Sequence, residues 1–196
     1  MNLLIPTGAI IGIAVGAVVL LLIIILLCWG IGARNGFVQM RNANEEAFAT
    51  IDVYLKKRYD LIPNLVETVK GYAKHESETL QNVIAARNNA ASATTTAEKI
   101  EADAKLSNAI RSFNVVAERY PDLKANANFL DLSSQLKDIE SQLAEQRRFY
   151  NALVKKFNTQ REMFPKSIIA GMMHLAKAPY FQLDSDVERQ NIKVQF

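Results

Sequence analysis

An uninterrupted apolar run near the N-terminus constrains this chain more than any other feature. The run extends from Gly8 to Ile31, and the first charged side chain of the sequence is Arg34. About 20 apolar residues in a helix cross the ~30 Å hydrocarbon core of a bilayer, where only a helix or a closed barrel satisfies its own backbone. One segment cannot close a barrel, so the sequence predicts a single transmembrane helix over residues 8–31 after a short tail, residues 1–7.

Two other readings of this segment fit the residues less well. The positions before the run contain no Lys or Arg, and the run is longer than the apolar region of a secretory signal peptide. A lipoprotein cysteine follows a small residue, whereas Cys28 follows Leu27. We therefore interpret the segment as an uncleaved anchor.

The basic residues beside the run predict its orientation. None precedes it, and Arg34 and Arg41 follow it, although Glu45 and Glu46 come soon after. Because cytoplasmic flanks are enriched in Lys and Arg, the sequence favours a short N-terminus outside and a cytoplasmic domain.

Glycines mark two features of the predicted span. Gly8, Gly12 and Gly16 are four residues apart on one helix face, and small residues at this spacing allow two helices to pack closely in lipid. Ordinary glycine usage in membrane helices is the alternative. Gly30, Gly32 and Gly36 lie at the exit, so residues 32–36 are predicted as a hinge.

Charge and composition narrow the class of the remaining chain. The sequence has 23 basic and 20 acidic residues and a net charge of +3, a balance that argues against a nucleic-acid partner. The one cysteine, Cys28, excludes an intrachain disulfide. Beyond residue 40 the chain is rich in Ala, Leu, Glu, Gln, Lys, Arg and Asn, which predicts an all-α domain.

Apolar residues repeat at helical spacing in four segments. The pattern predicts helices over about 37–59, 62–83, 100–120 and 129–164. Asp60 and Pro63 predict a turn between the first two, and residues 88–96 predict a loop. The last segment has a heptad seam from Phe129 to Phe164, typical of left-handed bundles.

Four amphipathic helices with short turns predict an antiparallel four-helix bundle over residues 37–164. The alternative is an extended coiled coil that pairs between chains. Residues 165–196 are predicted as a C-terminal segment with a short helix and an extended tail after Asp184.

Several polar residues lie on or beside the apolar faces of the first two predicted helices. In a bundle they could pair across helices as a buried network, or reach solvent at the edge of the bundle. The candidates are Asn44, Asp52, Arg58, Asn64, Glu76 and Arg87.

Basic residues accompany a short apolar piece near the end of the last predicted helix. In a bundle of this order that end returns to the bilayer, where cations suit anionic lipid headgroups. The alternative is that residues 167–181 close the open end of the bundle. The candidate headgroup contacts are Arg34, Lys155, Lys156, Arg161 and Lys166.

Motifs for catalysis or metal binding are not evident. His75-Glu76 begins like a zinc motif, but position 79 is Thr, and a metal site needs several converging ligands. The sequence has no Gly-rich phosphate loop and no Gly-Xaa-Ser-Xaa-Gly. We expect no enzymatic activity, no cofactor and no small-molecule substrate.

Longer stretches resemble the LemA family of bacterial membrane proteins. The resemblance rests on residues 51–76, on Arg119-Tyr120-Pro121-Asp122, on Phe149-Tyr150-Asn151 and on later pairs such as Phe164-Pro165. It extends from about Arg34 to the C-terminus, although Arg34-Asn35-Gly36-Phe37-Val38 keeps only part of the family's Tyr-Asn-Xaa-Leu-Val entry motif. The resemblance implies one transmembrane helix in a bacterial inner membrane, an antiparallel helical bundle and no established enzymatic activity.

These observations favour a non-enzymatic scaffold anchored in the membrane. We expect it to contact membrane lipid, to form a homo-oligomer and to organise the membrane or a membrane complex. The resemblance adds an alternative, because relatives are often encoded beside a heat-shock-type zinc protease and one branch is associated with magnetosome membranes. The chain would then act as an adaptor or regulator of a membrane protease.

Overall fold

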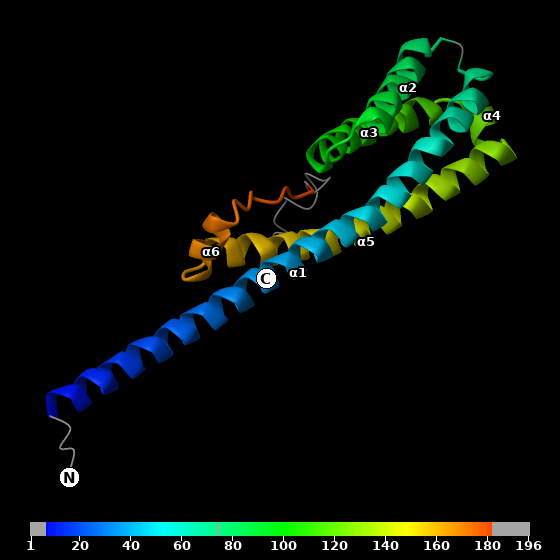
Figure 1. Ribbon diagram of the computed structural model, residues 1–196. Coiled ribbons are helices and arrows are strands. Elements are labelled where there is room, and N and C mark those ends of the chain that lie inside the picture. The colour runs from blue at the N-terminus through cyan, green and yellow to red at the C-terminus, as the bar shows by residue number, and fades with distance from the viewer. Residues whose placement is uncertain (1–6, 74, 182–196) are drawn as a thin grey trace, which may run out of the picture. The chain divides into compact units, whose positions relative to one another are not determined.

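The computed structural model describes residues 7–73 and 75–181, and every regular element among them is a helix. Figure 1 shows the elements in chain order. The helices are α1 (Thr7–Lys70), α2 (Ser77–Ser92), α3 (Thr96–Ala117), α4 (Pro121–Lys124), α5 (Ala127–Glu162) and α6 (Lys166–Met172).

The chain divides into two compact units, which we describe separately. Unit 1 contains Met1–Ala43 and Lys156–Lys177, and unit 2 contains Asn44–Lys155 and Ala178–Phe196. The helices α1 and α5 contribute to both units.

Unit 1 contains the N-terminal apolar stretch. Residues 11–29 of α1 are all exposed, and the helix is long and apolar enough to cross a membrane, with a mean hydropathy of 3.3 in its most apolar window. Further along α1, Ala33 and Phe37 are buried, and Phe37 makes an edge-on ring contact with Phe157 of α5. Burial in unit 1 therefore begins where the apolar exposed stretch ends.

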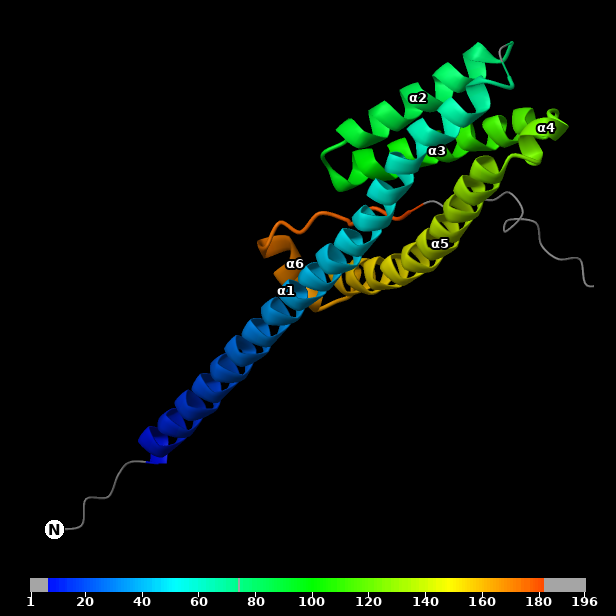
Figure 2. The same ribbon diagram turned by 90° about the vertical axis from the view of Figure 1, so that its right-hand side faces the viewer.

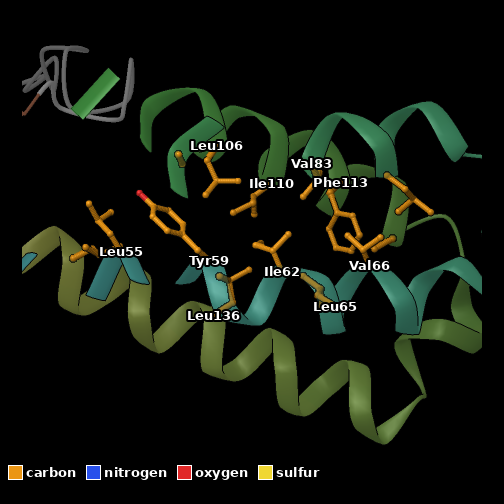
Figure 3. Close-up of a cluster of buried hydrophobic side chains, with 14 of the residues drawn as sticks. Leu55, Tyr59, Ile62, Leu65, Val66, Val83, Leu106, Ile110, Phe113 and Leu136 are labelled. Carbon is orange, nitrogen blue, oxygen red and sulfur yellow. The ribbon is translucent and has the colours of Figure 1, made fainter. Parts of the chain in front are cut away.

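Unit 2 is organised around one apolar core. The core takes side chains from α1, α2, α3, the short α4 and α5, together with Phe181. Figure 3 shows Ile62 and Val66 of α1 facing Ile110 and Phe113 of α3. The helices α2 and α3 lie side by side in both views of the ribbon (Figures 1 and 2). The short link between them ends at Thr95, which forms a capping box with Glu98 in the first turn of α3.

The turn predicted at Asp60–Pro63 is wrong, because α1 continues through Pro63 to Lys70. Proline has no N–H, so the carbonyl four residues earlier loses its helical partner. That carbonyl belongs to Tyr59, and the Arg87 Nε of α2 donates to it at 3.1 Å. A tertiary hydrogen bond thus replaces the missing helical one, and the chain turns instead at residues 71–72 and 75.

Three other boundaries differ from the sequence prediction. Residues 32–36, predicted as a hinge, are helical; bending there stays a prediction. The predicted loop at 88–96 is helical up to Ser92. Pro121 occupies the first turn of α4, where proline is tolerated. Phe164, which the sequence placed in the buried seam, is 80% exposed.

The rest of the seam in α5 is buried or partly buried. Phe129, Leu136, Leu143, Tyr150 and Phe157 are buried. Burial raises the pKa of Tyr150 to about 12, and its hydroxyl donates to the Pro179 carbonyl at 3.1 Å. The Asn151 side-chain amide also donates to the Phe181 carbonyl at 3.0 Å. These bonds fix the segment after α6 to α5 within unit 2.

Candidate functional site

The most distinctive polar feature of the described residues is a cluster of charges inside unit 2. Arg58 of α1 is 1% exposed and donates to Asp103 Oδ1 of α3 at 2.7 Å and to Ser107 Oγ at 3.1 Å. Its other terminal nitrogen lies 2.6 Å from Glu140 Oε1 of α5. Arg147 of α5 contacts the second oxygen of Asp103 closely. We call these five residues the charged cluster.

The helical period places the members of the cluster inside. Arg58 follows Leu55 by three residues and precedes Ile62 by four, so it shares their buried face. Asp103 lies three residues from both Ile100 and Leu106, and Arg147 lies four residues after Leu143 and three before Tyr150, so each shares a buried face in the same way. A polar residue in a buried apolar step was the signal that could have found Asp103 and Arg147.

Charges in the cluster balance. Two guanidinium groups face two carboxylates, and the Asp103 carboxylate is shared between both arginines. Burial costs several kcal/mol for each ion, and a balanced set with good hydrogen bonds offsets much of that cost. Burial, and the nearby charge of Asp103, raise the pKa of the Tyr59 hydroxyl above its usual value.

Two cavities of unit 2 are lined in part by residues of the cluster. One, of about 330 Å³, is lined by Asp103 and Arg147 together with Ile100, Pro179 and Phe181. The other, of about 580 Å³, is lined by Arg58, Ser107 and Glu140, and by apolar residues that include Phe129 and Leu136. Their sizes fall in the range of small-ligand pockets. The cluster residues on their walls, however, are already paired with one another.

No group of three or more His, Cys, Asp or Glu side chains that could hold a metal occurs within residues 7–73 and 75–181. The exposed His75 lies outside the cluster, and His174 occupies the capping position after α6 with φ of 51°. The cluster joins three helices through directional ion pairs, which is a way to specify register.

Of the six polar candidates named from the sequence, only Arg58 belongs to the charged cluster. Asp52 pairs with Lys99 Nζ at 2.8 Å, and Glu76 pairs with Arg119 at 3.1 Å. Arg87 Nε donates to the Tyr59 carbonyl. Asn44 is buried, with no hydrogen-bond partner for its Oδ1 among the described residues, and Asn64 is exposed.

The candidate headgroup contacts fall into two groups. Arg34, Lys155 and Lys156 are exposed. Arg161 and Lys166 are partly buried within unit 1, where Arg161 Nε donates to the Leu175 carbonyl at 2.6 Å and Lys166 Nζ donates to Gln160 Oε1. Lipid contact by any of the five stays a prediction.

Glycines of the predicted packing face are open where the structure describes their surroundings. A Cβ added at Gly12 or Gly16 would meet nothing within 4 Å. The surroundings of Gly8 lie outside the described side chains.

Comparison with known proteins assigns the chain to a family. The model of the LemA family matches residues 47–196, which is most of the chain. The chain belongs to the LemA family. The LemA match begins within unit 2 and includes the whole charged cluster, whereas the exposed apolar stretch of α1 precedes it.

Individual relatives agree with this assignment. Protein LemA of Metamycoplasma hominis is 24% identical over 163 residues, which cover 83% of this chain and 74% of that protein. Magnetosome proteins MamQ 1 and MamQ 2 of Paramagnetospirillum magneticum are each 27% identical over 81 residues. That stretch covers 41% of this LemA-family chain and only 30% of each MamQ protein.

Proposed function

We propose that this LemA-family chain is a non-enzymatic scaffold that anchors a helical domain in a membrane. The observation that supports this proposal is that one helix, α1, contributes both the exposed apolar stretch and part of the core of unit 2. Its residues 11–29 are apolar and exposed, whereas its residues from Ala47 to Val69 supply the core of unit 2. Exposed apolar surface of this extent is stable in lipid and not in water.

The scaffold domain is proposed to be an antiparallel four-helix bundle. Support comes from the shared core, which takes side chains from α1, α2, α3 and α5, and from the short links between consecutive helices. The charged cluster adds ion pairs between α1, α3 and α5.

We place the anchor in the bacterial inner membrane with the domain in the cytoplasm. Arg34 and Arg41 follow the apolar stretch, and both belong to α1. Protease treatment of sealed inverted vesicles tests this orientation: unit 2 should be digested there and protected in vesicles of the opposite sidedness. Digestion in the opposite pattern would reverse the assignment.

Self-association through Gly8, Gly12 and Gly16 gives the scaffold a way to organise a membrane. The open surroundings of Gly12 and Gly16 leave room for a second helix. The mass of the full chain in detergent, measured by light scattering, should exceed that of a monomer. Gly12→Leu should lower this mass, and Ala14→Leu, which alters a neighbouring exposed position, should not.

Exposed basic residues of α1 and α5 are proposed to contact anionic lipid. The exposed Arg34, Lys155 and Lys156 are free to approach headgroups, at about 1 kcal/mol per charge near the surface. Flotation of the soluble part with vesicles should increase with anionic lipid content and weaken at high salt. Binding that is independent of lipid charge would remove this part of the proposal.

An adaptor for a membrane protease is the second candidate. The exposed Phe149 of α5, at 57%, favours it because exposed aromatic side chains are common anchors in protein interfaces. Co-purification of the full chain with a membrane protease, lost on Phe149→Ala, would support the adaptor. Retention of the protease by that variant would argue against this surface.

A further inference from the structure

The helix α6 packs against α1 where the apolar stretch ends. A Cβ added at Gly30 would lie 3.9 Å from Ile169 Cδ1, and Ala170 is 3% exposed. Both ribbon views place α6 beside this part of α1 (Figures 1 and 2). All of these residues belong to unit 1, so their arrangement is internal to one compact unit.

The depth of α6 follows from the length of the exposed apolar stretch. The stretch from Ile11 to Ile31 is about 30 Å long at 1.5 Å per residue, which equals the hydrocarbon thickness of a bilayer. Gly30 lies at its end and Arg34 follows one turn later. A helix that touches α1 at Gly30 therefore lies at the level where hydrocarbon meets headgroups.

Large apolar side chains are exposed on α6 and at the adjoining end of α5. Phe164 is 80% exposed and Met172 is 72% exposed. Ile168 and Met172 are four residues apart on one face of α6, whereas Ile169 contacts α1. We define the α5–α6 corner as the four exposed side chains Met163, Phe164, Ile168 and Met172.

Basic residues are interspersed with the corner in the sequence. Residues 156–177 contain four Lys or Arg residues and one acidic residue, Glu162. Lys166 opens α6, and Lys177 ends unit 1. Long cationic side chains can lie along an apolar surface while their charges reach the headgroups. An apolar patch with a cationic border suits the interface of a leaflet that contains anionic lipid.

We propose that the α5–α6 corner inserts into the lipid leaflet at the end of the span. The corner is then a second membrane contact beside α1, and it fixes how deeply unit 1 is held. The inference rests on the proposed anchoring by α1, and it differs from headgroup contact because the side chains involved are apolar.

Site-directed fluorescence on the full chain tests the insertion. In a Cys28→Ser background, single cysteines replace Leu20, Phe164, Met172 or Phe149, and each is labelled with bimane after reconstitution into vesicles of neutral and anionic phospholipid. Phe149 is the matched control, since it is an exposed aromatic of unit 2. Nitroxide-labelled lipids, with the nitroxide high or low on the acyl chain, then quench labels that lie in the leaflet.

The pattern of quenching separates the possible outcomes. We expect deep nitroxides to quench the label at Leu20, and shallow nitroxides to remove most emission from the labels at Phe164 and Met172 but not at Phe149. Quenching at Leu20 alone, with Phe164 and Met172 as water-exposed as Phe149, would overturn insertion and keep the anchor. No quenching at Leu20 would overturn both. Blue-shifted labels at the corner that lipids do not quench would show that protein covers it.

Discussion

Between Ile11 and Trp29, α1 exposes its apolar side chains on all sides, whereas between Ala47 and Val69 the same helix turns them into a core. The second stretch also buries Arg58 almost completely. One helix therefore lies in two environments. Its N-terminal part needs apolar surroundings. Its C-terminal part packs into an apolar protein core, in which any buried charge has to be paired.

Removal of Asp103 is the largest expected disturbance of the inward-facing part. Asp103→Ala leaves the guanidinium groups of Arg58 and Arg147 without the carboxylate they share. Loss of one partner from a buried ion pair costs about 3–5 kcal/mol. Urea unfolding of the full chain in detergent, followed by circular dichroism, should show a loss of this size.

The matched control is Asp52→Ala, which removes a carboxylate that also pairs with a cation on α3. Its side chain is 44% exposed, so we expect a loss of only about 0–1 kcal/mol. Equal losses from the two variants would show that burial of the cluster is not what makes it sensitive.

A charge placed in the outward-facing part tests the other side of the comparison. Leu20→Arg puts a cation near the centre of the exposed stretch, where insertion into a bilayer costs about 2.5–3.5 kcal/mol. The variant should be extracted from membranes by alkaline carbonate more readily than the wild type.

Val115→Arg is the control for that measurement. Val115 is 63% exposed and Leu20 is 60% exposed, so the two positions differ in surroundings and not in exposure. Val115 lies in the last turn of α3, where a cation suits the helix C-terminus. Extraction of both variants to the same degree would argue that the apolar stretch does not meet lipid.

The third prediction concerns what keeps the inward-facing part helical at Pro63. Arg87→Ala leaves the Tyr59 carbonyl without its donor, and an unsatisfied buried polar group costs about 1–3 kcal/mol. In a Pro63→Ala background the restored N–H can take that carbonyl, so the same change should cost less. A double-mutant cycle on unfolding free energies measures the coupling, and additive effects would mean that Arg87 does not replace the helical bond.

This proline shows where the sequence failed as a guide to the fold. The apolar periods predicted the helical class, the exposed span and most of the core positions on α5, because these depend on residues close together in the chain. Pro63 predicted a turn by the same local logic. The Tyr59 carbonyl, which Pro63 leaves without a helical partner, accepts from Arg87, 28 positions after Tyr59, and local spacing does not predict that contact.

The sequence predicted only part of the charged cluster, for a similar reason. Arg58 stood out because it interrupts an apolar face, and Asp103 and Arg147 occupy equivalent places on their helices. Glu140 and Ser107 also lie in buried steps, three residues before Leu143 and Ile110, but the partners they take depend on how α3 and α5 approach α1. Asn64, chosen by the same rule as Arg58, is exposed, so position on a face alone does not identify the partner.

The smallest effect is expected at the end of α6, the helix that packs beside the outward-facing part of α1. The N–H of His174 donates to the Gly171 carbonyl, and that of Leu175 donates to the Ala170 carbonyl, with His174 in the left-handed region at φ of 51°. This is a Schellman cap with His where glycine is usual.

His174→Gly relieves backbone strain of about 1–2 kcal/mol but adds disorder to the unfolded chain, about 0.5–1 kcal/mol. We expect a net gain below about 1 kcal/mol, or a rise in Tm of about 1–3 °C. His174→Ala keeps the strained φ and should give no rise, so an equal rise from both variants would locate the effect in the imidazole and not in the backbone.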